Sequence, residues 1–152
     1  MKPMGPIPAT FVAADGHLLI DGHRAVDLAE QTPCFVYSKA MLTAQFAALR
    51  AAMPGQLAIH YAMKANPFGP LLSHMNTLVD GFDIASGGEL ALAIKAGVDP
   101  SRISFAGPGK RDAELTAAID NGVTLNAESE GEVARALAIA AELGVTPRIA
   151  IR

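Results

Sequence analysis

The sequence has no tryptophan, one cysteine and few aromatic residues, and these scarcities exclude several classes of protein. The aromatic share is 5% of 152 residues, and the single cysteine, Cys34, cannot form an intrachain disulfide. No apolar run approaches the ~18–20 residues that span a bilayer. The proline-rich start also lacks the apolar stretch of a secretory signal. We therefore expect a cytoplasmic protein that does not cross a membrane.

The sequence also has little charge and no basic cluster. Charged residues make up 18% of the chain, the formal net charge is −3, and the pI is near 5.7, so we expect no nucleic-acid partner. With 51% hydrophobic residues the chain can bury the core of one globular domain. We expect no metal site, because His17, His23 and His74 do not have the spacing of metal ligands.

From about residue 55 the chain alternates short apolar segments with longer amphipathic ones. We expect strands at Leu57–Met63, Gly81–Ala85, Ile103–Ala106, Thr124–Ala127 and Arg148–Ile151. Helices are expected at Gly69–Leu78, Gly88–Ala96, Asp112–Asn121 and Gly131–Leu143, two of them opened by the capping boxes Ser86–Glu89 and Ser129–Glu132. This alternation predicts an α/β fold with a parallel sheet.

The N-terminal part does not follow this period. We expect a strand or hairpin at Phe11–Ile20, a short helix at Arg24–Glu30, a strand at Thr32–Tyr37, and a helix from Ser38 to Met53. Residues 1–31 are interpreted as an N-terminal extension and residues 32–152 as the α/β domain.

The periodicity fits both an open, flavodoxin-like sheet and a closed (β/α)8 barrel. A complete barrel needs ~250 residues. The chain ends at Arg152, inside a strand pattern, so a barrel would be present as its first half.

Strand alternation selects Lys64 and Asp83 as candidate functional residues. Ile59, Tyr61 and Met63 share the face expected to meet the helices, which leaves Lys64 inward at the end of its strand. By the same alternation we expect Asp83, Asn126, Glu128 and Arg152 inward on their strands. Catalytic groups of parallel α/β proteins lie at such strand ends. A lysine in a water-poor site has a lowered pKa, and its amine can bond to an aldehyde cofactor. The alternative interpretation is a surface lysine at the start of a loop.

Structural roles explain several other polar residues. Glu89 is the third residue of a capping box, and His60 is expected to be a hydrogen-bonded core histidine. Cys34 is expected to be buried, and Lys110–Asp112 to be a solvated helix start.

Five motifs together resemble a known family. They are Thr32–Tyr37 (TPCFVY), His60–Pro67 (HYAMKANP), Gly81–Leu90 (GFDIASGGEL), Ile103–Lys110 (ISFAGPGK) and Asn126–Ser129 (NAES). In this order they resemble the pyridoxal-phosphate-dependent decarboxylases of diaminopimelate, ornithine and arginine, which have an alanine-racemase-like barrel. The chain is most similar to the diaminopimelate-decarboxylase-like branch, which includes decarboxylases associated with exosortase systems.

The resemblance implies the N-terminal half of a (β/α)8 TIM barrel of alanine-racemase-like type. It implies pyridoxal 5'-phosphate as cofactor, joined to Lys64 as a Schiff base, with Ala62, Asp83 and Arg152 also at the cofactor. Lys64, Asp83 and Glu89 are the catalytic residues that it implies.

The resemblance also implies a lyase reaction, decarboxylation of meso-diaminopimelate to lysine in lysine biosynthesis, ahead of ornithine or arginine as substrate. The family is expected to be homodimeric. Its later strands and C-terminal β-domain are missing here, so the chain alone is expected to be inactive and to self-associate through its open sheet edges. An amino-acid racemase and a non-catalytic pyridoxal-phosphate-binding or regulatory protein remain alternatives.

Overall fold

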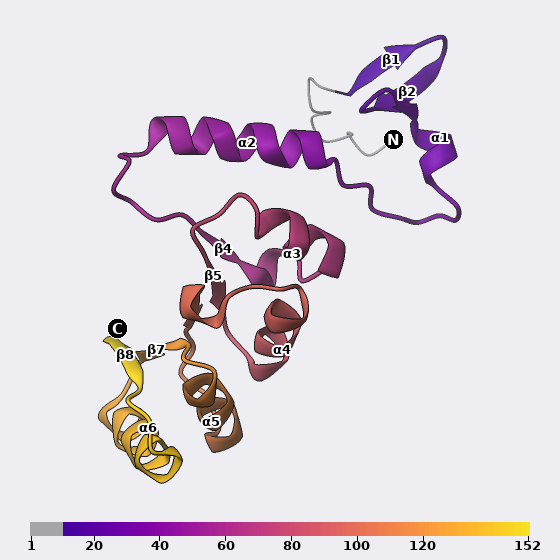
Figure 1. The fold of residues 1–152 in the computed structure, drawn as a ribbon. Coiled ribbons are helices and arrows are strands. Elements are labelled where there is room, and N and C mark those ends of the chain that lie inside the picture. The colour runs from indigo at the N-terminus through magenta and orange to yellow at the C-terminus, as the bar shows by residue number, and fades with distance from the viewer. Residues whose placement is uncertain (1–10) are drawn as a thin grey trace. The chain divides into compact units, whose positions relative to one another are not determined.

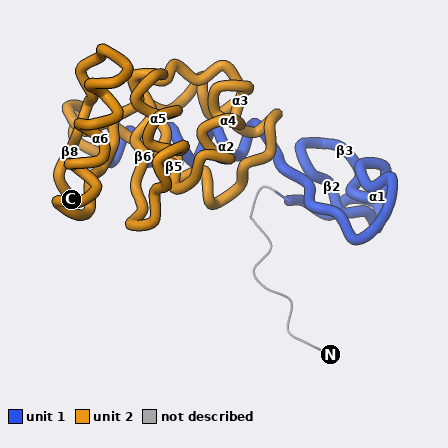
Figure 2. The backbone as a smooth tube through the Cα atoms, turned by 90° about the horizontal axis from the view of Figure 1, so that it is seen from below, with its two compact units in different colours: residues 1–52 blue, residues 53–152 orange. Residues whose placement is uncertain are grey.

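In a computed structural model, which describes residues 11–152, the chain divides into two compact units. Unit 1 comprises Met1–Ala52 and unit 2 comprises Met53–Arg152 (Figure 2). Residues 1–10 of the predicted extension lie outside the described residues. The boundary predicted between residues 31 and 32 falls within unit 1 and stays a prediction.

Unit 1 begins with a small antiparallel sheet of β1 (Val12–Ala14), β2 (His17–Ile20) and β3 (His23–Arg24), followed by α1 (Ala25–Leu28). The first turn contains Asp15 and Gly16 at φ values of 51° and 75°, as a tight hairpin with a matching twist requires. The predicted hairpin and short helix are confirmed.

Helix α2 (Lys39–Ala52) ends unit 1 and begins as predicted. The Ser38 hydroxyl oxygen accepts the Met41 N–H at 3.0 Å and so caps the helix, while the same hydroxyl donates to Asp21.

The strand predicted at Thr32–Tyr37 is wrong. Within the described residues this segment pairs with no strand, and Phe35 is 88% exposed. Its apolar, β-branched composition favours extended backbone, but a strand forms only where a neighbour supplies the ladder hydrogen bonds. Cys34, expected to be buried, is exposed for the same reason.

Unit 2 is a parallel five-stranded sheet whose strand order follows the sequence (Figure 1). Its strands are β4 (His60–Ala62), β5 (Gly81–Ile84), β6 (Ile103–Phe105), β7 (Thr124–Ala127) and β8 (Arg148–Ile151). A doubly wound sheet reverses its strand order at a switch point, whereas a barrel wall adds each strand beside the previous one. The order therefore corresponds to the first part of a (β/α)8 barrel and not to a flavodoxin-like sheet.

Each strand of unit 2 except the last is followed by a helix. The helices are α3 (Gly69–Met75), α4 (Gly87–Lys95), α5 (Asp112–Asp120) and α6 (Glu130–Leu143), with 3-10 turns η1 (Met63–Ala65) and η2 (Pro100–Arg102). Successive helices pack against each other, α3 on α4, α4 on α5 and α5 on α6. Both predicted serine caps form, since Ser86 and Ser129 accept the Glu89 and Glu132 N–H groups at 3.2 Å each.

The core of unit 2 confirms the predicted facing of its second strand. Phe82 and Ile84 are buried at 0% and 1% exposure, while Asp83 between them is half-buried. Helix residues such as Leu72, Leu90 and Leu115 complete this core. The sheet face that carries Asp83 and the C-terminal strand ends are not filled by this apolar core, so polar side chains can lie there.

Candidate functional site

Four of the five predicted site residues line one cavity at the C-terminal ends of the strands. The cavity has a volume of about 210 Å³ and is lined by Lys64, Asp83, Ile84, Ala85, Glu89, Ala106, Gly107 and Arg152. The fifth residue, Ala62, is not part of this lining; it is the register partner of Asp83 across the β4–β5 ladder. We call this space the Lys64 cavity.

Lys64 reaches the cavity from a turn and not from a strand. Strand β4 ends at Ala62, and Lys64 lies in the 3-10 turn that follows, so strand alternation did not give the correct reason for its position. The turn is fixed on both sides, because Met63 is fully buried and the Tyr61 hydroxyl donates to the Asn66 carbonyl at 3.0 Å.

The water-poor setting expected for Lys64 is not formed by these residues, because Lys64 is exposed. The inner face of the five-stranded sheet has no further strand opposite it in the part of the chain that the structure describes. Burial of a lysine at this position requires further chain on that side of the sheet.

Glu89 has the structural role that its capping position predicts. Its Oε2 accepts the Ala85 N–H at 2.7 Å, and its own N–H donates to the cap Ser86. The carboxylate thus holds the turn after β5 while it lines the cavity. One residue can serve both purposes, since a carboxylate oxygen has two lone pairs.

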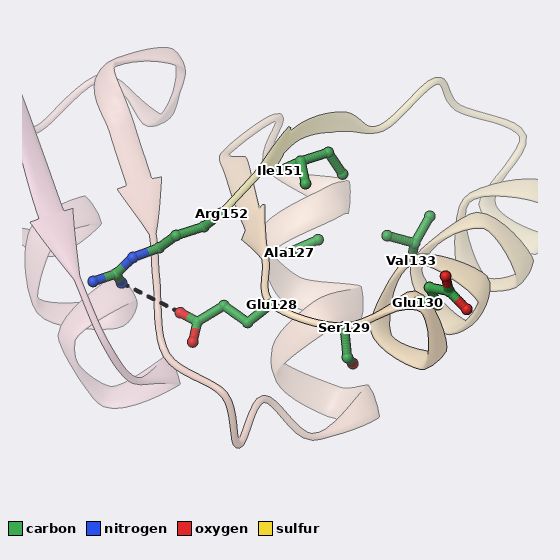
Figure 3. Close-up of a pocket in the computed structure, with 7 residues that line it drawn as sticks. All are labelled: Ala127, Glu128, Ser129, Glu130, Val133, Ile151 and Arg152. Atoms are coloured by element: carbon green, nitrogen blue, oxygen red, sulfur yellow. Dashed lines mark hydrogen bonds and ion pairs between the residues drawn. The ribbon is translucent and has the colours of Figure 1, made fainter.

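Arg152 lies where two cavities meet. Its backbone N–H donates to the Ala127 carbonyl at 3.0 Å, and its Nη1 lies 3.3 Å from Glu128 Oε1 (Figure 3). The second cavity, of about 250 Å³, is lined by Ala127, Glu128, Ser129, Glu130, Val133, Ile151 and Arg152. The guanidinium therefore connects the Lys64 cavity with the start of α6.

Sequence reasoning missed a buried ion pair behind the cavity. Lys110 was expected at a solvated helix start, but its side chain is 1% exposed and its Nζ lies 2.6 Å from Glu132 Oε1. The same Nζ donates to the carbonyls of Gly107 at 2.7 Å and Asn126 at 2.8 Å, so all three ammonium hydrogens have acceptors. The sequence signal for this ion pair was Glu132, the third residue of the following helix, α6.

His60 also differs from expectation, because it is exposed and not part of the core. Strand β4 is an edge of the described sheet, and the His60 ring lies over Gly81, where an added Cβ would come within 2.7 Å of it. A glycine at position 81 is what allows this close approach.

Among residues 11–152, no group of three or more His, Cys, Asp or Glu side chains is arranged to hold a metal ion. In the same range, none of the helices has the length and apolar character needed to cross a membrane.

Comparison with known proteins gives the family. The family model described as pyridoxal-dependent decarboxylase, pyridoxal binding domain, matches residues 39–152. The chain belongs to this family. The predicted resemblance, the diaminopimelate branch and the barrel fold are thereby confirmed.

Relatives with determined sequences and structures agree. The chain is 46% identical to a diaminopimelate decarboxylase of Aquifex aeolicus over 142 residues, 91% of this chain and 33% of that protein. It is 37% identical to that of Pseudomonas aeruginosa over 94% of this chain and 35% of the relative. The crystal structure of diaminopimelate decarboxylase from M. jannaschii in complex with L-lysine matches with a TM-score of 0.87 and 31% identity, over 95% of this chain and 36% of that one. The chain thus spans about a third of the length of these relatives.

The Lys64 cavity fits one side of a pyridoxal phosphate site. It offers a primary amine for the aldehyde, a carboxylate at Asp83 and a guanidinium at Arg152 for anionic oxygens. Complete small-molecule pockets have volumes of roughly 300–1,000 Å³, more than the cavity provides. The cavity formed by the described residues is therefore smaller than a complete site for such a ligand.

Proposed function

We propose that the protein carrying this chain is a pyridoxal-phosphate-dependent carboxy-lyase that converts meso-diaminopimelate to L-lysine. The observation that carries the proposal is that Lys64, Asp83, Glu89 and Arg152 line one cavity at the C-terminal ends of the strands. Family membership and the relatives named diaminopimelate decarboxylase support the reaction and the substrate. The association with exosortase systems stays a prediction.

Lys64 would hold the cofactor through its ε-amine, with Ala62, Asp83 and Arg152 around it. When bound, pyridoxal phosphate supplies an electron-withdrawing ring that accepts the electron pair left when the α-carboxyl group departs as carbon dioxide. Asp83 contributes a carboxylate to the cavity wall, whose oxygens can accept hydrogen bonds from donors of a bound ligand. Glu89 holds the turn at Ala85 and so keeps the wall beside Asp83 in place.

Reduction with borohydride tests the assignment of Lys64. The full-length protein would be loaded with pyridoxal phosphate, reduced and digested, and its peptides analysed by mass spectrometry. We expect the cofactor mass on the peptide containing Lys64 and its loss in Lys64→Ala. The exposed Lys39 offers a matched control, because Lys39→Ala should leave the labelling unchanged. Cofactor mass on another lysine would contradict the assignment.

The reaction itself is tested by product analysis with meso-diaminopimelate. Release of carbon dioxide with equimolar lysine is the expected result. Formation of a stereoisomer without carbon dioxide would instead identify a racemase. Cofactor binding with neither decarboxylation nor a stereoisomer would identify a non-catalytic carrier.

We also propose that the full-length protein is a homodimer, as the family resemblance implies, and that the isolated chain self-associates through its open sheet edges. Strands β4 and β8 each have one sheet neighbour among the described residues, and unpaired strand edges favour association. Sedimentation velocity at micromolar concentration should show a dimer, and a strict monomer would contradict this. The cytoplasmic location and the inactivity of the isolated chain stay predictions.

A further inference from the structure

Glu128, directly after β7, contacts two residues of the Lys64 cavity although it lines only the neighbouring one. Its Oε1 accepts the Gly107 N–H at 2.7 Å. The same oxygen lies 3.3 Å from Arg152 Nη1 (Figure 3). Gly107 and Arg152 both line the Lys64 cavity. One carboxylate oxygen therefore connects the loop after β6 with the end of β8.

The backbone around Glu128 is itself held in place. The Glu128 N–H donates to Glu132 Oε2 at 3.4 Å, and the other oxygen of Glu132 forms the buried ion pair with Lys110. Lys110 in turn donates to the Gly107 carbonyl at 2.7 Å. Gly107 is thus held at its N–H by Glu128 and at its carbonyl by Lys110.

Gly107 adopts a backbone conformation that favours glycine, with φ at +112°. The direction of its N–H therefore depends on this conformation as well as on its acceptor. Hydrogen bonds hold both the N–H and the carbonyl of Gly107, and its conformation is one that other residues adopt only with strain. The loop that contains Gly107 is therefore suited to setting the position of the cavity wall.

We propose that Glu128 is a positioning residue of the cofactor site, which orients the Arg152 guanidinium and the Gly107 loop at the wall they share with Lys64. The proposal rests on the proposed function, because that function places the cofactor at this wall. The Glu128 side chain is 21% exposed and that of Arg152 66%, so the pair has one anchored member and one that reaches outward. A guanidinium has five N–H donors, which leaves donors for an anionic oxygen of a ligand. This oxygen belongs either to the cofactor phosphate or to the substrate carboxylate.

The test measures cofactor affinity and steady-state kinetics in the full-length protein. Glu128→Gln keeps an oxygen that can accept the Gly107 N–H but removes the charge beside Arg152. We expect it to weaken pyridoxal phosphate binding or raise KM by about three- to tenfold, the range of a partly exposed charged pair. Weaker cofactor binding, measured by absorbance titration, assigns Arg152 to the phosphate. A raised KM with unchanged cofactor affinity assigns it to the substrate carboxylate.

Two further variants show whether Glu128 acts through Arg152. In an Arg152→Met background, Glu128→Gln should change neither the cofactor affinity nor KM by more than about twofold, because Arg152, the partner of Glu128, is already lost. The matched control is Glu130→Gln, an exposed carboxylate two residues further on, which should bind cofactor like the unsubstituted protein. The visible circular dichroism of the bound cofactor should change in Glu128→Gln and not in the control.

Equal affinities and KM values for Glu128→Gln and Glu130→Gln would overturn the proposal, as would an undiminished effect in the Arg152→Met background. Should Glu128→Gln fail to fold, Glu128→Asp replaces it. This side chain keeps the charge but is too short for both contacts, so unchanged binding and KM in that variant would also overturn the proposal. Borohydride labelling separates the two ideas, since a failure of the proposed function removes the label at Lys64 from the unsubstituted protein.

Discussion

The loops at the two ends of the parallel sheet in unit 2 are stabilised by side chains of different charge. At the C-terminal strand ends, carboxylates accept backbone N–H groups, as Glu89 does from Ala85, Glu114 from Gly87 and Glu128 from Gly107. At the N-terminal strand ends, arginines donate to backbone carbonyls, as Arg102 does to Asp80 and Arg148 to Ser101.

The polarity of the helices explains this difference. A loop that follows a strand leads into a helix start, where N–H groups lack partners, and a loop that precedes a strand leaves a helix end, where carbonyls lack partners. The same arrangement gathers carboxylates near Lys64 and keeps the arginines of the other end away from it. The division is not complete. Lys110 and Arg135 donate to carbonyls at the carboxylate end, and Asp80 and Asp99 accept the N–H groups of Ile59 and Ser101 at the other end.

Lys110→Met should have the largest effect on stability. It leaves the Glu132 carboxylate buried without its ion-pair partner, which typically costs about 3–5 kcal/mol. Urea denaturation of the full-length protein would measure the free energy of unfolding. The adjacent exposed Arg111→Met is the control, and an equal loss in both variants would contradict a special role for the buried pair.

Arg102→Met should destabilise the N-terminal end of the sheet without changing the Lys64 cavity. Arg102 donates to the Asp80 carbonyl at 2.9 Å, to Asn76 Oδ1 at 3.1 Å and to the Val79 carbonyl, and losing these bonds should cost about 2–3 kcal/mol. Cofactor affinity well below the melting temperature should not change. A weakened affinity would show that the two ends are not separate in function.

Gly107→Ala should have a smaller effect on stability and a clear one on cofactor binding. The φ of +112° makes an alanine strained by about 1–3 kcal/mol. Gly109→Ala is the matched control, since Gly109 lies in the same loop without a positive φ and with open space around its Cα. Equal melting temperatures for the two variants would show that the Gly107 conformation is not required.

Acid should weaken the carboxylate end through Glu114. Hydrogen bonds from the Arg111 side chain and from the Gly87 and Arg111 N–H groups lower the pKa of Glu114 from 4.5 to about 2. Because the folded-state pKa is the lower one, this carboxylate stabilises the fold above pH 4.5, and its contribution is lost as the pH falls towards 2.

Denaturation of the unsubstituted protein and of Glu114→Gln at several pH values measures this contribution. The unfolding free energies of the two should differ most above pH 4.5 and converge on acidification. A constant difference between them would argue against the ionised Glu114 as the cause.

Local rules predicted most of unit 2 and parts of unit 1 from the sequence. Strands β7 and β8 have the predicted bounds, and the Ser38, Ser86 and Ser129 caps form where expected. These features depend on residues close together in the sequence.

The wrong predictions concern contacts between distant segments. Lys110 is buried because of Glu132, 22 residues away, and the Thr32–Tyr37 segment is no strand because nothing among residues 11–152 pairs with it. For the site, alternation predicted the position of Asp83 correctly. Lys64 reaches the cavity through a turn that alternation does not describe.

A crystal structure of the full-length protein with pyridoxal phosphate would show directly whether Lys64 carries the cofactor. We expect a covalent bond between Lys64 Nζ and the aldehyde carbon of the cofactor, with Asp83 and Arg152 on the surrounding wall. A cofactor bonded to any other lysine, or seated away from the C-terminal ends of β4–β8, would contradict it.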